Sequence, residues 1–309
     1  MLGIDAGGTK TVCLLADERG HVISEARGNG ANLTATGGQE VERALRDVIT
    51  QALGHHNIQP DAICLGIAGV DRAHDAAAVQ SIMRRIDSTT RTLVVNDALV
   101  ALVAGAGEDP SVVIVAGTGS IAYGRDAAGR AARAGGWGYL LGDEGGGFWI
   151  GRAALSAVVR QFDGRGPVTL LTELVLAELR LDSPPELIQA VYEHGLPRRS
   201  IASIASVVQR AHDAGDAIAS EIIDRAASEL ASAAASVINQ LSMRGEDFRI
   251  VLAGGIFCGI PALVPNVSGR LPDVAPRSRV RLLDAEPAMG AVRLALAAAR
   301  GEATIPVYI

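Results

Sequence analysis

The sequence contains one short pattern twice, and this repetition limits the fold more than any other feature. An apolar strand predicted at residues 2–5 runs into a turn rich in glycine and threonine, and the same succession recurs at residues 111–120. Each turn leads into two further predicted strands, so each copy opens with a β-meander. Because a supersecondary unit that occurs twice indicates a duplicated domain, we expect two related halves.

The elements after each meander follow from the spacing of apolar residues. In the first half they complete the order βββαβαβα, and in the second half a longer run of helices precedes the last strands. The predicted strands are 2–5, 11–16, 21–27, 62–66, 92–95, 111–116, 121–125, 131–134, 249–253 and 279–283. The predicted helices are 39–53, 76–86, 98–104, 150–162, 170–181, 185–194, 200–214, 216–243, a short helix within 260–271, and 287–300.

No linker separates the halves, so we expect two α/β domains packed around a cleft. The first would span residues 1–105 and be completed by helix 287–300, and the second would span 106–286 with a helical insertion. A chain of 309 residues is long enough for both.

Composition excludes several classes of protein. The formal net charge is −6 and no basic block stands out, which argues against nucleic acid or a membrane surface as a partner. Cys13, Cys64 and Cys258 lie in or beside apolar stretches without a C-x-x-C pair, which predicts three reduced core thiols in a cytoplasmic protein. No basic signal-peptide region is evident, and prolines interrupt the uncharged run 250–269.

The first turn of each meander is a candidate phosphate site. Gly8, Thr9 and Lys10 offer backbone N–H groups, a hydroxyl and an ammonium group, and Gly117 and Thr118 occupy the corresponding place in the second half. The spacing matches neither a Walker A loop nor a Rossmann fingerprint. A hairpin turn also needs glycine for its own geometry, so each turn alone leaves both interpretations open.

The stretch 135–152 gathers both tryptophans, two acidic residues and a dense set of glycines. Asp143 and Glu144 precede a predicted helix start, where backbone N–H groups point outward. Carboxylates, aromatic side chains and open backbone suit a polyhydroxylated ligand. The alternative is a glycine-rich turn that merely tightens the connection between a strand and a helix.

Asp97 stands where an apolar strand gives way to a helix. The carboxyl ends of strands in open α/β sheets form ligand crevices, which makes this carboxylate a candidate for the site. Asp is also a common helix N-cap, so a purely structural role is the alternative.

Several motifs in one order resemble the acetate/sugar kinase, Hsp70 and actin superfamily, whose fold is a pair of ribonuclease H-like domains. These motifs are Asp5-x-Gly-Gly-Thr-Lys10, Asn96-Asp97, Gly117-Thr-Gly-Ser120, Gly254-Gly255 and the glycine of a terminal helix at Gly290. Within the superfamily, the Gly-Trp-Gly and Gly-Asp-Glu-Gly segments of 135–145 resemble the N-acetylglucosamine kinase branch of the BadF/BadG/BcrA/BcrD ATPase family.

The resemblance implies a kinase that transfers the γ-phosphoryl group of ATP to the 6-hydroxyl of an amino sugar, with Mg²⁺ as cofactor and a homodimer as the expected assembly. Asp97 matches the catalytic base and also contacts the sugar. The other implied sugar contacts are Asn32, Ser120, Gly136, Trp137, Gly138 and Asp143. The implied ATP contacts are Gly8, Thr9, Lys10, Gly117, Thr118, Gly254 and Gly255, and Asp5 would hold Mg²⁺ through water. Glu144 is expected only to buttress the loop.

The identity of the amino sugar is kept open. Three consecutive glycines at 145–147 leave little bulk beside the expected sugar site, so glucosamine or N-acetylmuramic acid could replace N-acetylglucosamine.

Two other functions are kept open. An ATPase activator of a radical dehydratase resembles the chain in the phosphate turns, but it would hold an iron–sulfur cluster through cysteines that are not placed for this here. A non-catalytic, nucleotide-gated protein like actin would need no base at Asp97.

Overall fold

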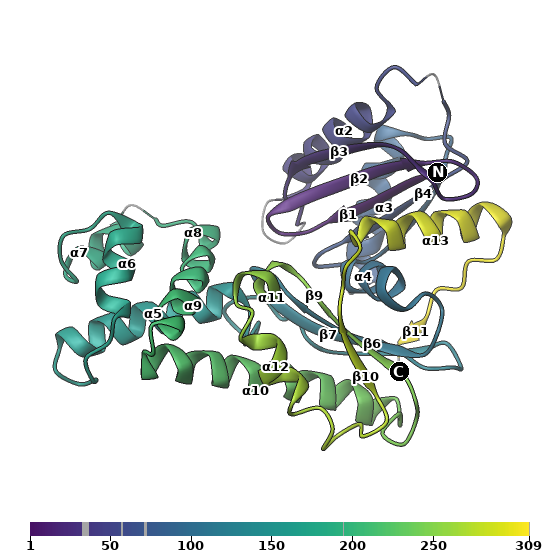
Figure 1. Ribbon diagram of the computed structural model, residues 1–309. Helices are drawn as coiled ribbons and strands as arrows, with labels where there is room; N and C mark the ends of the chain where they lie inside the picture. The colour runs from purple at the N-terminus through teal and green to yellow at the C-terminus, as the bar shows by residue number, and fades with distance from the viewer. Residues whose placement is uncertain (33–36, 57, 71–72, 194, 309) are drawn as a thin grey trace. The chain divides into compact units, whose positions relative to one another are not determined.

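The computed structural model describes residues 1–32, 37–56, 58–70, 73–193 and 195–308. These residues form two β-sheets with helices (Figure 1). The elements follow the predicted order, and most boundaries lie within three residues of the prediction. The α/β class expected from the sequence is therefore confirmed.

The first sheet has the strand order β3-β2-β1-β4-β5. Its strands are β1 (Leu2–Ala6), β2 (Lys10–Ala16), β3 (Val22–Asn29), β4 (Ala62–Ile67) and β5 (Arg91–Asn96). The meander β1–β2–β3 is antiparallel, whereas β4 runs parallel to both β1 and β5. Ala6, Ile67 and Asn96 are in register, so the carboxyl ends of the three parallel strands lie level at one edge.

The second sheet has the order β10-β9-β6-β7-β8-β11. Its strands are β6 (Ser111–Ala116), β7 (Ser120–Arg125), β8 (Arg130–Gly135), β9 (Arg249–Ala253), β10 (Arg279–Leu282) and β11 (Val307–Tyr308). Read from β8 to β10, the order repeats that of the first sheet, as a duplication requires. The strand β11, which the sequence did not predict, pairs in parallel with β8.

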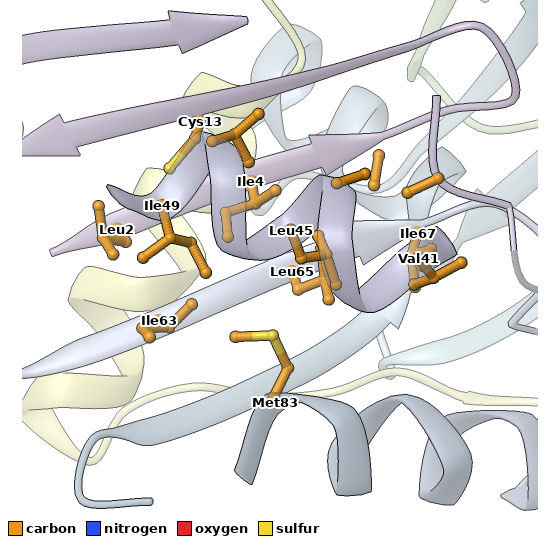
Figure 2. Packing of buried hydrophobic residues seen from close by; sticks show 14 of the residues in the cluster. Leu2, Ile4, Cys13, Val41, Leu45, Ile49, Ile63, Leu65, Ile67 and Met83 are labelled. Carbon is orange, nitrogen blue, oxygen red and sulfur yellow. The ribbon is translucent and has the colours of Figure 1, made fainter. Parts of the chain in front are cut away.

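Helices cover both faces of the first sheet. Leu2, Ile4 and Ala6 of β1 pack with α2 (Gly38–Leu53) and α3 (Ala73–Ile86) in the cluster of buried residues drawn in Figure 2. On the other face, β2 packs against α13 (Ala288–Arg300), which also contacts α4 (Asp97–Ala106). Period-two alternation in β1 and β2 thus supplies two cores, one on each side of the sheet.

The second half adds a run of helices, and their boundaries differ most from prediction. They are α5 (Gly147–Phe162), α6 (Leu171–Leu179), α7 (Glu186–Ile188), a π-helix (Gln189–Glu193), α8 (Arg198–Ser203), α9 (Ala205–Asp213), α10 (Ala217–Gln240), α11 (Gly255–Gly259) and α12 (Leu263–Ser268). The predicted helix 185–194 is a short α-helix continued by the π-helix, and its last residue lies outside the described part of the chain.

The predicted helix 200–214 is also wrong as a single element, because it divides at Ile204. The Ser203 hydroxyl donates to the Ser200 carbonyl at 2.8 Å, and the Ser206 hydroxyl donates to the Ser203 carbonyl at 2.8 Å. Serine hydroxyls that bond to carbonyls one turn back compete with the helical ladder and bend helices. The break therefore has a local cause in the serine spacing.

The prediction of three core thiols is wrong for Cys258. Cys13 and Cys64 are buried, and burial raises the pKa of Cys13 to about 12. Cys258 lies in the short helix α11, where Phe257 is the buried residue and Cys258 is exposed. The apolar run around Cys258 contains a short helix with one buried face, and the sequence alone does not show which of its residues face inward.

By its internal contacts the chain divides into two compact units. Unit 1 contains 1–113, 123–132 and 283–309, and unit 2 contains 114–122 and 133–282. The helix α13 belongs to unit 1. The domain boundary at residue 105 stays a prediction. Among helices of the described residues, none has the length and apolar character needed to cross a bilayer.

Candidate active-site residues in the two units

In unit 1, the predicted phosphate turn is joined to the loop that carries Asn32. The turn closes through a hydrogen bond from the Gly7 N–H to the Lys10 carbonyl at 3.0 Å. The Ala31 N–H donates to the Gly7 carbonyl at 3.0 Å, which holds the neighbouring Asn32 beside the turn. Thr9 and Lys10 are exposed, as a ligand-binding turn requires.

Asp97 lies at the carboxyl end of β5 and is the first residue of α4. The N-cap of this helix is Asn96, whose side-chain oxygen accepts a hydrogen bond from the Ala98 N–H at 2.7 Å. The structural alternative for Asp97, a capping role, is therefore filled by its neighbour. The Asp97 side chain is partly exposed at the edge where β1, β4 and β5 end.

Asp5 of β1 lies in an acidic environment at the same edge. Burial raises its pKa to about 7, with further contributions from the negative charges of Asp97 and Glu286, while Lys10 opposes the shift. Carboxylates that repel one another in this way favour a bound cation. Mg²⁺ is commonly held by one or two carboxylates together with substrate phosphates, so Asp5 fits the predicted role, with its neighbours adding favourable charge.

Among the described residues, no group of three or more His, Cys, Asp or Glu side chains is arranged to hold a metal ion by itself. The role of Asp5 stays a prediction.

Glu286, which sequence reasoning missed, holds the cation of the phosphate turn. Lys10 Nζ lies 3.0 Å from Glu286 Oε1, and a guanidinium nitrogen of Arg27 lies 3.0 Å from Glu286 Oε2. Glu286 is 276 positions from Lys10 in the sequence. The only local signal is an acidic residue just before Pro287 and the last helix. A phosphate that bound Lys10 would have to compete with this carboxylate.

The acidic edge makes unit 1 sensitive to pH. The unfolded chain ionises Asp5 near pH 4, whereas the folded protein keeps its proton up to about pH 7. The free energy of unfolding should therefore fall as pH rises between these values, by up to about 1.4 kcal/mol per unit. Asp5→Asn is expected to raise stability by roughly 2–4 kcal/mol at about pH 8, and by much less at about pH 5.

Urea unfolding of metal-free protein with a chelator present measures this effect. The exposed Asp47→Asn on α2 serves as the matched control, because it makes the same chemical change away from the acidic edge. An equal effect of Asp5→Asn on the free energy of unfolding at both pH values would show that the pKa of Asp5 is not raised in the folded protein.

In unit 2, the second predicted phosphate turn (residues 117–120) is held by hydrogen bonds from the glycine-rich loop at 135–146 and from the start of α5, which follows it. The Gly117 and Thr118 carbonyls accept hydrogen bonds from the N–H groups of Gly147 and Phe148 at 2.8 and 2.9 Å. The Ser120 hydroxyl donates to the Glu144 carbonyl at 2.6 Å. Glu144 thus touches the turn through its backbone, in keeping with the supporting role predicted for it.

Apart from Ser120, which belongs to the turn, the predicted sugar contacts of unit 2 lie in this loop. The N–H of Gly136 donates to the Ser120 carbonyl at 2.9 Å, and the Asp143 carboxylate accepts from the Gly138 N–H at 3.2 Å. Trp137 is 57% exposed, with the Arg133 guanidinium 4.9 Å from its ring centroid. An exposed aromatic face beside polar backbone suits a sugar, which presents both C–H and O–H groups.

The predicted adenosine loop contacts the strand that leads into the turn. Gly254 has a φ of +104°, and a Cβ there would lie 2.6 Å from the Ala116 carbonyl carbon. Gly255 has open space around it. A glycine at 254 is therefore needed for both its conformation and its contact, whereas Gly255 is exposed and accessible.

Gly254→Ala is expected to lower the free energy of unfolding by about 2–3 kcal/mol, because both strain and overlap oppose the methyl group. Gly255→Ala, which adds the same methyl group one residue on, should change it by less than about 1 kcal/mol. Thermal or urea unfolding of the two variants provides the comparison. Equal stability of the pair would contradict the close packing of Gly254 on Ala116.

The structure thus brings each group of predicted residues together within its own unit. Asp5, Asp97, Asn32 and the turn at 8–10 lie in unit 1. The turn at 117–120, Gly136, Trp137, Gly138, Asp143 and the glycines at 254–255 lie in unit 2. Their roles toward ATP and sugar stay predictions.

The fold is that of the ribonuclease H-like sugar kinases. A ROK family glucokinase from Streptomyces griseus, in complex with glucose and AMPPNP, matches with a TM-score of 0.62 and 15% identity over 96% of this chain and 97% of that one. A Chromobacterium violaceum protein provisionally described as an N-acetylglucosamine kinase matches with a TM-score of 0.75 and 25% identity, covering 96% of this chain and 98% of that one.

The chain belongs to the BadF/BadG/BcrA/BcrD ATPase family, whose model matches residues 2–295. An N-acetylmuramic acid/N-acetylglucosamine kinase from Clostridium acetobutylicum is 35% identical over 298 residues, covering 96% of this chain and 97% of the relative. An N-acetyl-D-glucosamine kinase from Dictyostelium discoideum is 31% identical, with 96% and 97% covered. The family resemblance of the motifs is therefore confirmed.

Proposed function

We propose that this protein is an ATP-dependent amino-sugar kinase that phosphorylates the 6-hydroxyl of N-acetylglucosamine or a close relative, such as glucosamine or N-acetylmuramic acid. Support comes from the relatives, which are kinases of N-acetylglucosamine and N-acetylmuramic acid. The observation that carries the proposal is Asp97, a partly exposed carboxylate at the carboxyl edge of the sheet whose neighbour Asn96 caps the helix.

In the proposed reaction, Asp97 accepts the proton of the sugar hydroxyl as the oxygen bonds to the γ-phosphorus. The bond between that phosphorus and the bridging oxygen of ADP breaks, and ADP leaves. A sugar hydroxyl is a weak nucleophile, so positioned proton acceptance is worth about 10²–10⁴-fold in rate. Asp97 would also hold the hydroxyl in place by hydrogen bonding.

The remaining residues bind and orient the substrates. Lys10 and the backbone of the two turns are proposed to face the phosphates, and Gly254 and Gly255 the adenosine. Asp5 would hold Mg²⁺ through water, and the bound ion would neutralise charge on the phosphate oxygens. Trp137 would form a wall of the sugar site, with Asn32, Ser120 and Asp143 as polar contacts.

We also propose that the protein works in the cytoplasm as a homodimer and that its domains divide near residue 105. The free thiols of Cys13, Cys64 and Cys258 support a reducing compartment. A dehydratase activator is not favoured, because only Cys258 of these three is exposed to reach a shared cluster.

The test is ADP release from ATP and Mg²⁺ against a panel of N-acetylglucosamine, glucosamine, N-acetylmuramic acid, N-acetylmannosamine and glucose. We expect release that depends on one or more of the amino sugars, with the phosphate located at the 6-position by NMR of the product. A protein that binds ATP but stays silent with every sugar would be a non-sugar ATPase. A brown, iron-containing preparation would point instead to the dehydratase activator.

A further inference from the structure

The Asp143 side chain lies at the junction of two segments for which different ligands are proposed. Its carboxylate accepts a hydrogen bond from the Gly138 N–H of the sugar loop (residues 135–143) at 3.2 Å, and the Ser120 N–H of the phosphate turn (residues 117–120) lies close enough to favour its charged form. It also packs against Gly119, where a Cβ would lie 2.7 Å from the Asp143 carboxyl carbon. One side chain therefore connects the sugar loop to the turn.

The conformation of Asp143 shows that its surroundings hold it in place. Its φ is +62°, in the left-handed region that costs a residue with a side chain roughly 1 kcal/mol or more. Such a conformation persists only where neighbouring contacts determine it. The two backbone donors and the contact with Gly119 are the contacts that do so.

Backbone hydrogen bonds reinforce the same junction. The Gly136 N–H of the loop donates to the Ser120 carbonyl at 2.9 Å, and the first two residues of α5, Gly147 and Phe148, donate to the Gly117 and Thr118 carbonyls at 2.8 and 2.9 Å. Because the turn is bonded both to the loop and to the start of the helix that follows it, a ligand that fixes the loop also restricts the turn. Asp143 is the side-chain component of this junction and the part that substitution can remove while the backbone stays intact.

We propose that Asp143 is a positioning residue that couples sugar binding on the loop to nucleotide binding on the turn at 117–120, so that each substrate tightens the binding of the other. This inference rests on the proposed kinase function. A sugar seated on Gly136–Gly138 would order the loop, and Asp143 would carry that order to Ser120 and Gly119. The turn is then already ordered when the nucleotide binds, so nucleotide binding loses less conformational entropy. This is positive cooperativity. The coupling must be equal in both directions.

Asp143→Asn tests the connection with little change of shape. A carboxylate accepts hydrogen bonds from two N–H groups, whereas an amide presents one oxygen and one NH₂ group. In the variant, one of the two backbone donors would therefore face another donor. The connection between Gly138 and Ser120 should then break, although the side chain fills the same space.

The experiment is calorimetric titration of a non-hydrolysable ATP analogue with Mg²⁺, with and without N-acetylglucosamine at a concentration that saturates each variant. For the wild type we expect the sugar to lower the Kd of the analogue by about 5–50-fold. For Asp143→Asn we expect a change within about twofold. If Asp143 were only a sugar contact, the variant would need more sugar but would show the wild-type ratio at saturation, which would overturn the inference.

Gly119→Ala provides a second test that substitutes none of the residues proposed to contact the sugar. Its methyl group would displace the Asp143 carboxylate, so the sugar-induced change in Kd should again fall to within about twofold. Gly245→Ala in the same unit is the matched control, since a Cβ there meets no other atom, and it should keep the wild-type ratio. Circular dichroism checks that each variant is folded. If Asp143→Asn does not fold, the Gly119→Ala variant decides the question.

The outcomes separate the inference from the function on which it rests. A wild-type protein that binds neither the analogue nor the sugar would contradict the kinase proposal itself. A wild-type protein that binds both, with no effect of one on the other, would leave the kinase proposal standing and overturn the coupling.

Discussion

Asp97→Asn is expected to lower kcat for sugar phosphorylation by about 10²–10⁴-fold, because the amide cannot accept the proton of the attacking hydroxyl. The substitution keeps the shape of the side chain. It should also leave the fold intact, because Asn96 and not Asp97 caps α4. Affinity for ATP should change much less than kcat, since the proposed role of Asp97 concerns the sugar hydroxyl and its side chain affects the proposed Mg²⁺ residue Asp5 only through its charge.

Steady-state kinetics and titration of a non-hydrolysable ATP analogue measure the two quantities separately. Asp47→Asn on the exposed face of α2 makes the same chemical change away from the acidic edge, and it should retain full activity. Loss of nucleotide binding together with turnover would show that Asp97 maintains the nucleotide site and would count against its role as a base. Undiminished turnover would instead favour a protein that needs no base at this position.

Gly290→Ala is expected to destabilise the protein by about 2–3 kcal/mol, through overpacking between α13 and α4. A Cβ at 290 would overlap the Val100 carbonyl oxygen and lie 2.7 Å from the Ala104 backbone nitrogen. Both obstacles are backbone atoms, so no side-chain rotation can relieve them. Helix propensity alone predicts the opposite sign, with a gain of about 1 kcal/mol for alanine over glycine inside a helix.

Urea unfolding curves decide the sign. Gly38→Ala in the first turn of α2 is the matched control, because its Cβ would make an ordinary contact of 3.9 Å with Ile82. Its free energy of unfolding should stay within about 0.5 kcal/mol of the wild type. A Gly290→Ala protein as stable as the wild type would mean that α13 can move away from α4 without loss.

The sequence by itself determined the order of the elements, their duplication and the candidate residues at their ends. Apolar spacing is a local property, so it located the strands of both meanders and most helices to within a few residues. The candidates at 8–10, 97, 117–120 and 135–143 stood out because polar or glycine-rich segments followed apolar strands. The structure assigns the candidates at 8–10 and 97 to unit 1 and those at 117–120 and 135–143 to unit 2, and their roles stay predictions.

Only the tertiary structure decided which partners these residues have. Glu286 reaches Lys10 across 276 positions, and the Asp143 carboxylate accepts a hydrogen bond from the Gly138 N–H and packs against Gly119. The exposure of Cys258, the pairing of β11 with β8 and the need for glycine at 290 likewise depend on elements distant in the chain. Periodicity shows which face of an element is buried, but the identity of the atoms that meet that face is set by packing between segments that the local pattern does not connect.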